Sequence, residues 1–168
     1  MLLETKRLAL FKFTKEDASF LFELVHDPKW IKHIGNKSIH SLLDAEKYIE
    51  STIIPCYETL GFGLYVVKLK GQDTAIGLCG LLKRDWMEHV EIGYGFLTLY
   101  RRKGYAIEAS TAIQNYAKVH LGIGSLAAIT GVHNEKSNSL LDRLGMHFNR
   151  LISYPGETKK YKLYLNKG

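Results

Sequence analysis

The sequence lacks most of the features that would place a protein in a disulfide-rich or metal-binding class. Of its 168 residues, only 2 are cysteine and 3 are proline. Cys56 and Cys79 form no Cys-x-x-Cys pair and have no histidine at metal-ligand spacing, and Cys79 lies within the apolar run 76–82, as a core cysteine does. The histidines are scattered along the chain. We therefore expect neither an oxidising compartment nor a metal site.

Long apolar runs are also missing. No stretch approaches the roughly 18–20 apolar residues that a membrane-spanning helix needs, and the segment 1–7 carries charge too early for a secretory signal. These features exclude a membrane role and predict a cytoplasmic protein. Repeats and Pro-, Gly- or Ser-rich linkers are absent as well, so the length predicts a single domain over 1–168.

The composition that remains is that of a globular domain with a moderate positive charge. Hydrophobic residues make up 46% and charged residues 24% of the chain, and the formal net charge is +6. This charge suits a polyanionic partner, either RNA or a phosphate-rich cofactor. The basic residues are scattered apart from 101–103 and 159–160. Nucleic-acid binding as the main role is therefore disfavoured.

Hydrophobic periodicity predicts a mixed order of strands and helices. Strands are expected over 7–13, 63–70, 75–82, 89–99, 126–132, 147–154 and 160–165. Helices are expected after Thr14 as far as Asp27, from Ser41 or Asp44 to about Ile53 ahead of Pro55, over 105–120, and over about 136–144. The segment 105–120 is the clearest helix, because its apolar residues recur at steps of three and four. This order predicts a mixed α/β (α+β) sheet domain.

A short basic turn, Arg101-Arg102-Lys103-Gly104-Tyr105-Ala106, leads directly into the helix expected over 105–120. The first N–H groups of a helix have no partner within the helix, and the helix dipole places partial positive charge there. Gly104 permits positive φ or a close approach of the backbone to a ligand. Basic side chains can bind diphosphate oxygens. The turn predicts an anion site, although taken alone it fits a solvated basic turn equally well.

With its surroundings, this turn resembles that of the GNAT superfamily of N-acetyltransferases, in which R/Q-x-x-G-x-G/A lies between the fourth strand and the following helix. The resemblance is most specific to the branch of the ribosomal-protein-alanine N-acetyltransferases (Rim type). Its E-x-G-Y strand and G-Y-A-x-E-A helix start match 91–94 and 104–109, and its N-x-x-S and L-G-F segments match 134–137 and 144–146, the last with Met146 for Phe. The order of elements agrees from Arg7 to the C-terminus.

The resemblance implies a strongly twisted mixed sheet of about seven strands, flanked by about four helices and splayed between the fourth and fifth strands. It implies an enzyme that transfers an acetyl group from acetyl-CoA to a primary amine in a ternary complex, without a metal. A β-bulge at 93–95 would open the splay, although these glycines also suit packing against a helix. The cofactor-binding residues so implied are Phe96, Leu97 and Thr98 through their backbones, Arg101, Arg102, Lys103, Gly104, Tyr105, Ala106, Asn134 and Ser137.

Two catalytic candidates follow from the resemblance. Glu91 is the candidate general base, acting directly or through water, because in strict alternation it shares a face with two glycines that leave room beside it. A structural salt bridge is the alternative. Ser137 is expected to bond the cofactor or the leaving sulfur, whereas Asn134 suits a helix N-cap, a cofactor contact or both. Many relatives carry a tyrosine seven residues after that Asn as the acid; here the residue is Leu141, so the acid is Ser137, another tyrosine, water or no group.

The acceptor side is less well defined by the sequence. The resemblance places it along the loop 30–36, with 154–158 opposite, and the candidate substrate-binding residues are Trp30, His33 and Tyr94. Trp30 fits the core equally well, and His33 fits a surface position. The acceptor is a protein N-terminus or a small amine such as a polyamine, an amino-acid derivative or an antibiotic. A catalytically idle CoA-binding protein is the alternative function, and we expect a monomer or a homodimer.

Overall fold

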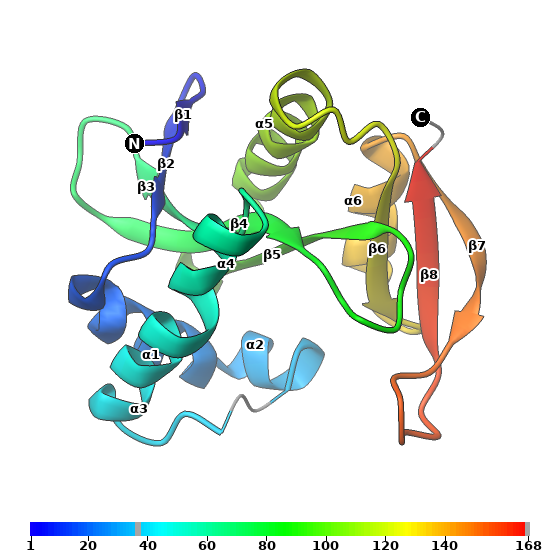
Figure 1. Ribbon diagram of the computed structural model, residues 1–168, viewed down its shortest axis with the longest axis horizontal. Coiled ribbons are helices and arrows are strands. Elements are labelled where there is room, and N and C mark those ends of the chain that lie inside the picture. Colours follow the sequence, from blue (N-terminus) through cyan, green and yellow to red (C-terminus); the bar gives the residue numbers. More distant parts are fainter. Residues whose placement is uncertain (36–37, 167–168) are drawn as a thin grey trace.

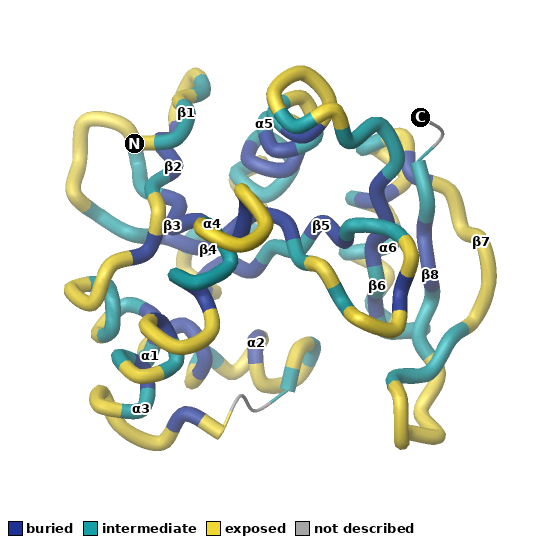
Figure 2. The backbone as a smooth tube through the Cα atoms, viewed as in Figure 1, coloured by how far each residue is buried: buried dark blue, intermediate teal, exposed yellow. Residues whose placement is uncertain are grey.

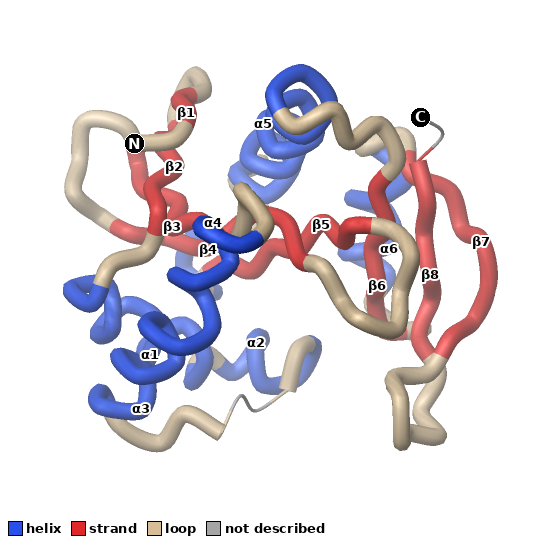
Figure 3. Tube along the Cα trace, viewed as in Figure 1, coloured by secondary structure: helices blue, strands red, loops and turns tan. Residues whose placement is uncertain are grey.

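One sheet runs through the protein, with helices on both of its faces. The computed structural model describes residues 1–35 and 38–166, which form eight strands in the order β1-β2-β3-β4-β5-β6-β8-β7 and six α-helices (Figures 1 and 3). The strands are β1 (Leu3–Glu4), β2 (Leu8–Lys12), β3 (Leu64–Leu69), β4 (Ala75–Leu82), β5 (Val90–Phe96), β6 (Leu126–Gly131), β7 (Met146–Ile152) and β8 (Tyr161–Asn166). The helices are α1 (Ala18–His26), α2 (Pro28–His33), α3 (Leu42–Tyr48), α4 (Ile54–Thr59), α5 (Tyr105–His120) and α6 (Glu135–Arg143).

The sheet splays between β5 and β6. These strands are parallel and pair only through Val90 with Leu126 and Glu91 with Ala127, whereas every other neighbouring pair is antiparallel. Beyond Glu91, β5 stays paired with β4 as far as Phe96 but no longer with β6. Figure 1 shows β6, β8 and β7 running in a different direction from β5. The sequence did not predict the short strand β1, so β5 and β6 are the fourth and fifth of the predicted strands. The predicted mixed, twisted sheet with a splay between those two strands is confirmed.

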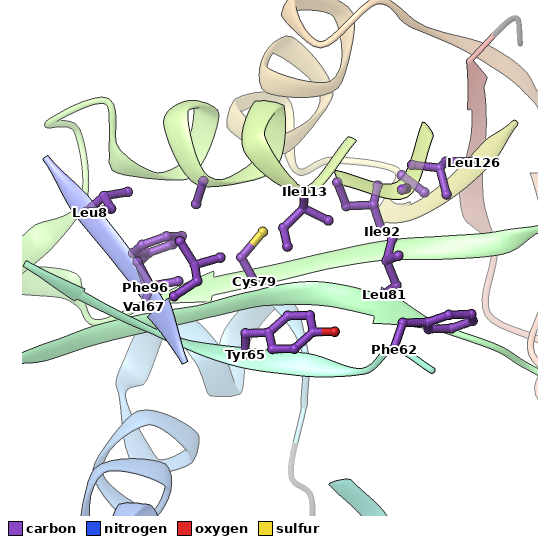
Figure 4. Close-up of a cluster of buried hydrophobic side chains, with 14 of the residues drawn as sticks. Leu8, Phe62, Tyr65, Val67, Cys79, Leu81, Ile92, Phe96, Ile113 and Leu126 are labelled. Carbon is purple, nitrogen blue, oxygen red and sulfur yellow. The ribbon is translucent and has the colours of Figure 1, made fainter. Parts of the chain in front are cut away.

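Alternation along the central strands sends apolar side chains to both faces. Val67 and Cys79 point into a cluster against α5, and Val66 and Leu78 point into a second cluster against α1 and α3. Figure 4 shows the first cluster, with Cys79 facing Ile113 of α5, and Figure 2 shows the dark, buried course of β4 through the centre. Because both faces are covered, β4 contains no polar side chain except a buried thiol.

Two helical segments differ from the sequence prediction. Residues 30–33, expected in a loop, belong to α2: Asp27 ends α1 and also caps α2 by accepting a hydrogen bond from the Lys29 N–H at 2.9 Å. The helix expected to stop before Pro55 continues instead through a π-helical turn, Ile49–Ile53, into α4. Proline lacks an N–H and clashes with the carbonyl four residues earlier, and a wider turn relieves both problems.

The start of α5 is tied to the N-terminal strands through Glu108. Its Oε1 accepts hydrogen bonds from Thr5 Oγ1 at 2.6 Å and from the Arg7 N–H at 2.8 Å, and its Oε2 accepts one from Arg7 Nε at 2.7 Å. Burial alone would raise the pKa of Glu108, but these hydrogen bonds and the charge of Arg7 lower it below its ordinary value. The carboxylate therefore stabilises the fold in its ionised form.

We expect Glu108→Gln to lower the free energy of unfolding by about 1–2 kcal/mol at pH 7. Because the folded pKa is lowered, the stabilisation is complete above the unfolded pKa of about 4.3 and is lost as the pH falls through the folded value. Denaturant unfolding at pH 7 and near pH 3 measures this, and the two proteins should converge in acid. Glu23→Gln, on the exposed side of α1, is the control and should change little. Equal stability of Glu108→Gln and wild type at pH 7 would contradict the role of Glu108.

Candidate functional site

The turn 101–106 leaves the N-terminus of α5 open. Gly104 is the N-cap residue, with φ of 80°, and it has no side chain to cap the helix. The first bond of the helix runs from the Glu108 N–H to the Gly104 carbonyl at 3.2 Å, so the N–H groups of 105–107 have no partner within the helix. A helix of 16 residues therefore presents free donors and the positive end of its dipole to any anion bound here.

Arg7 braces this turn from the side, a role that the sequence did not indicate. Its Nη1 donates to the Lys103 carbonyl at 2.8 Å, and its guanidinium lies 4.6 Å from the centre of the Tyr105 ring. A Cβ placed on Gly104 would lie 3.1 Å from Arg7 Nη2. The turn thus needs glycine at 104 for its positive φ and for this close approach.

Basic residues of α2, the turn and α6 repel one another electrostatically. The pKa of Lys136, at the start of α6, is lowered first by the charge of Arg102, then by loss of solvent, and then by the charges of Lys29, Arg101 and Lys32. Cations that repel one another in this way are typical of a site for a multiply charged anion. The sequence pointed only to 101–103, because Lys29 and Lys32 share a helix face only once α2 is known.

The backbone of 96–98 makes hydrogen bonds within the fold. The Phe96 carbonyl accepts from Arg101 Nε at 2.8 Å, and the Leu97 N–H donates to the Ile76 carbonyl at 3.0 Å. The Thr98 N–H and Oγ1 both donate to the Asp27 carboxylate, each at 2.7 Å. These bonds engage part of the backbone in the fold, and binding of the cofactor by the remaining groups of 96–98 stays a prediction. The edge of β5 that has lost its strand partner lies earlier, over 92–95.

The glycines of β5 act as packing glycines. The pairing of β4 with β5 is regular through 93–95, so the expected bulge is absent there and the splay arises from β6 turning away. A Cβ on Gly95 would lie 2.4 Å from the Trp30 ring. Trp30 is only 4% exposed and belongs to the second core cluster. Trp30 therefore lies in the core and not in an open wall. Its indole nitrogen has no hydrogen-bond partner among the described residues.

Glu91 is a buried carboxylate at the point where the splay begins. It is 5% exposed, and its Oε2 accepts a short hydrogen bond from Arg84 Nε, in an ion pair. The Arg84 guanidinium in turn lies over the Tyr154 ring at 5.1 Å and near the Trp86 ring at 6.0 Å. The salt bridge given as the alternative for Glu91 is present, whereas the room expected beside the two glycines is taken up by Leu82 and Trp30. Arg84 favours the ionised carboxylate, the form that accepts a proton.

Tyr94 and Ser137 lie together on the opposite face of the sheet. The Tyr94 hydroxyl and Ser137 Oγ are 2.7 Å apart, and Asn134 Oδ1 caps α6 by accepting from the Ser137 N–H at 3.3 Å. Tyr94 was predicted to bind the acceptor with Trp30, but alternation along β5 turns it away from Gly95 and toward α6. Leu141 is 1% exposed and belongs to the main core.

The remaining acceptor candidates lie around the end of α2. His33 is partly buried, and burial, followed by the charges of Arg101 and nearby lysines, lowers its pKa below the ordinary value. Ile31 and Ile34 are about half exposed, at 50% and 42%. Asn36 lies outside the described residues. Tyr154, from the 154–158 segment, stands beside the Glu91 ion pair as described above.

Beyond Trp86, a hollow of about 560 Å³ lies between the β4–β5 connection and the last two strands. Leu163 and Leu165 contribute to its lining, as do Arg150 and Lys160. Within residues 1–35 and 38–166, no three His, Cys, Asp or Glu side chains are grouped so that they could hold a metal ion. None of the described helices combines the length and the apolar character needed to cross a membrane.

Known proteins share both this sequence pattern and this fold. The family model of the acetyltransferase (GNAT) domain matches residues 7–147. The uncharacterized N-acetyltransferase YoaA of Bacillus subtilis is 27% identical over 146 residues, which cover 86% of this chain and 81% of YoaA. An acetyltransferase from Agrobacterium tumefaciens superposes with a TM-score of 0.84 at 20% identity, covering 99% of this chain and 94% of that one. RimL, a ribosomal L7/L12 alpha-N-protein acetyltransferase solved with coenzyme A, superposes with a TM-score of 0.83 at 16% identity, covering 98% and 96%.

Proposed function

Since the chain belongs to the GNAT acetyltransferase family and is an acetyl-CoA-dependent N-acetyltransferase, we propose that its acceptor is the N-terminal amine of a polypeptide, bound on the Glu91 face of the sheet. The observation that carries the proposal is the pairing of Glu91 with Arg84 at the mouth of the splay. This pairing leaves the acceptor end with a proton-accepting carboxylate whose charge is already balanced.

The residues around the splay fit acetyl-CoA. The open N-terminus of α5 and the cations on α2, the turn and α6 suit its phosphate groups. The unpaired edge of β5 over 92–95 suits its pantetheine amides, because an extended amide chain can add to a free strand edge. Acetyl-CoA supplies an activated thioester, and the protein has only to place it, remove a proton from the amine and stabilise the leaving thiolate.

Base and acid candidates stand on opposite faces of the sheet. Glu91 lies on the face covered by α1–α4, and Ser137 lies on the face covered by α5 and α6. An acyl group held in the splay therefore has the carboxylate on its acceptor side and a hydroxyl on its leaving-group side. We assign proton removal from the amine to Glu91, directly or through one water, and hydrogen bonding to the leaving sulfur to Ser137.

The charge around the acceptor end favours a polypeptide over a polyamine. The charge of Glu91 is balanced by Arg84. The charged side chains that lower the pKa of His33 are all cations. A polyamine would bring several further positive charges to this region. A polypeptide N-terminus brings one amine, with a pKa near 8, that loses its proton easily. We propose that the side chains following this amine enter the hollow of about 560 Å³ whose lining includes Trp86, the ring near Arg84.

A screen of acceptors with detection of free thiol tests the proposal. The panel contains hexapeptides with a free N-terminus, the same peptides with a blocked N-terminus and an internal lysine, single amino-acid amides, and spermidine. We expect kcat/KM for the free N-terminal peptides to exceed that of the other acceptors by about tenfold or more. Preference for spermidine or for the internal lysine would overturn the acceptor assignment. Release of no thiol with any acceptor would support a CoA-binding protein without activity.

A further inference from the structure

The Tyr94–Ser137 hydrogen bond joins two elements across the splay. Tyr94 belongs to β5, three residues beyond the last pair with β6, and Ser137 lies in the first turn of α6. Their hydroxyl oxygens are 2.7 Å apart, a full-strength O–H···O distance. A bond in this place spans the opening beside β5 on its leaving-group side. The two residues are 43 positions apart in the chain, so only the fold brings them together.

The chemistry of the two hydroxyls sets the direction of this bond. A phenol is a better donor than an aliphatic alcohol, and burial keeps Tyr94 protonated by raising its pKa to about 12. Tyr94 therefore donates and Ser137 Oγ accepts. Ser137 Oγ makes this one hydrogen bond within the part of the chain that the structure describes. The hydrogen of the serine hydroxyl thus remains available for a second acceptor.

Position 141 cannot supply this hydroxyl. Leu141 lies one turn after Ser137 on the same side of α6, is 1% exposed and packs in the main core. Ser137 is therefore the hydroxyl that α6 offers toward β5, and a short side chain such as serine needs help to hold one rotamer.

We propose that Tyr94 is a positioning residue that aims the Ser137 hydroxyl at the sulfur of the departing thiolate, an inference that rests on the proposed acetyl transfer. As the tetrahedral intermediate collapses, its C–S bond breaks and the electron pair moves to sulfur. Ser137 stabilises that charge by donating its O–H to the sulfur, while Tyr94 keeps its own proton. The thiolate then takes a proton from solvent, because its pKa is near 8.5. The acceptor's proton leaves by way of Glu91 or water.

The test combines Tyr94→Phe, Ser137→Ala and the double variant, with peptide acceptor and acetyl-CoA varied separately. We expect Tyr94→Phe to lower kcat by about tenfold and Ser137→Ala by about 10²-fold, with KM for acetyl-CoA within about twofold of wild type. Because Tyr94 acts through Ser137, the double variant should be no slower than Ser137→Ala alone. Ser137→Thr keeps the hydroxyl and should retain most of kcat.

Two controls separate this role from a structural one and from failure of the proposed function. Tyr164→Phe removes the hydroxyl of another buried tyrosine in the same core cluster and should leave kcat unchanged. Stabilisation of every variant by CoA shows that it is folded and binds the cosubstrate. Wild-type kcat in Tyr94→Phe, or losses that add fully in the double variant, would overturn the proposal. Absence of turnover in the wild type would instead remove the proposed function.

Discussion

Replacing Gly104 with valine is expected to abolish binding of CoA. Gly104 has φ of 80°, a conformation that disfavours a β-branched residue by about 1–2 kcal/mol or more. A Cβ there also meets Arg7 Nη2 at 3.1 Å. The added side chain would stand where phosphate oxygens must approach the free N–H groups of α5. The variant should therefore show no CoA-dependent rise in thermal midpoint, whereas saturating CoA should raise that of the wild type by about 5–10 °C.

Gly122→Val is the matched control for this prediction. Gly122 follows the other end of α5, also has a positive φ, of 68°, and has no atom within 4 Å of an added Cβ. It should suffer the same backbone strain and some loss of stability, yet still be stabilised by CoA. Tight binding of CoA by Gly104→Val, or loss of binding in both variants, would contradict our assignment of the turn.

Glu91→Gln is expected to lower kcat by about 10²-fold while leaving KM for acetyl-CoA nearly unchanged. Glutamine keeps a carbonyl oxygen that can accept from Arg84 but cannot take a proton at neutral pH. The deficit should shrink as the pH rises above about 8, because an α-amine with a pKa near 8 then reaches the site already neutral. A pH–rate profile of kcat for wild type and variant, with a free N-terminal peptide as acceptor, measures this.

The buried ion pair needs its own control. Removal of one partner leaves Arg84 half-buried without a counter-charge, which destabilises a protein more than the loss of an exposed charge does. Thermal unfolding of Glu91→Gln must therefore show a folded protein at the assay temperature. Glu58→Gln, an exposed change on α4 away from the hollow, should leave kcat unaltered. A profile for Glu91→Gln parallel to that of the wild type would remove Glu91 as the base.

The sequence could predict those features that depend on local pattern. The helix over 105–120 has the bounds predicted for it, because its apolar spacing and its preceding glycine are local signals. The splay was foreseen through the family resemblance, not from the residues themselves. The helix α2 was missed because Asp27-Pro28 both ends one helix and begins another. From the sequence alone, an Asp-Pro pair predicts the end of a helix more readily than the start of the next one.

Contacts between distant segments account for most of what was missed at the site. Asp27 takes the hydrogen-bonding groups of Thr98 across 71 positions, and nothing in the sequence joins the two residues. Arg84 lies in a connection without a recognisable pattern, yet it holds Glu91. Alternation along β5 is a local signal, and the pattern that groups Glu91 with Gly93 also places Tyr94 on the other face.

A crystal structure of the protein with bound CoA is the most direct test of this account. We predict diphosphate oxygens within about 3.2 Å of the backbone nitrogens of 104–106. The pantetheine arm should lie along the free edge of β5 over 92–95, with the sulfur between Glu91 and Ser137. Binding of CoA elsewhere on the molecule, or a pantetheine arm that runs outside the β5–β6 opening, would contradict it.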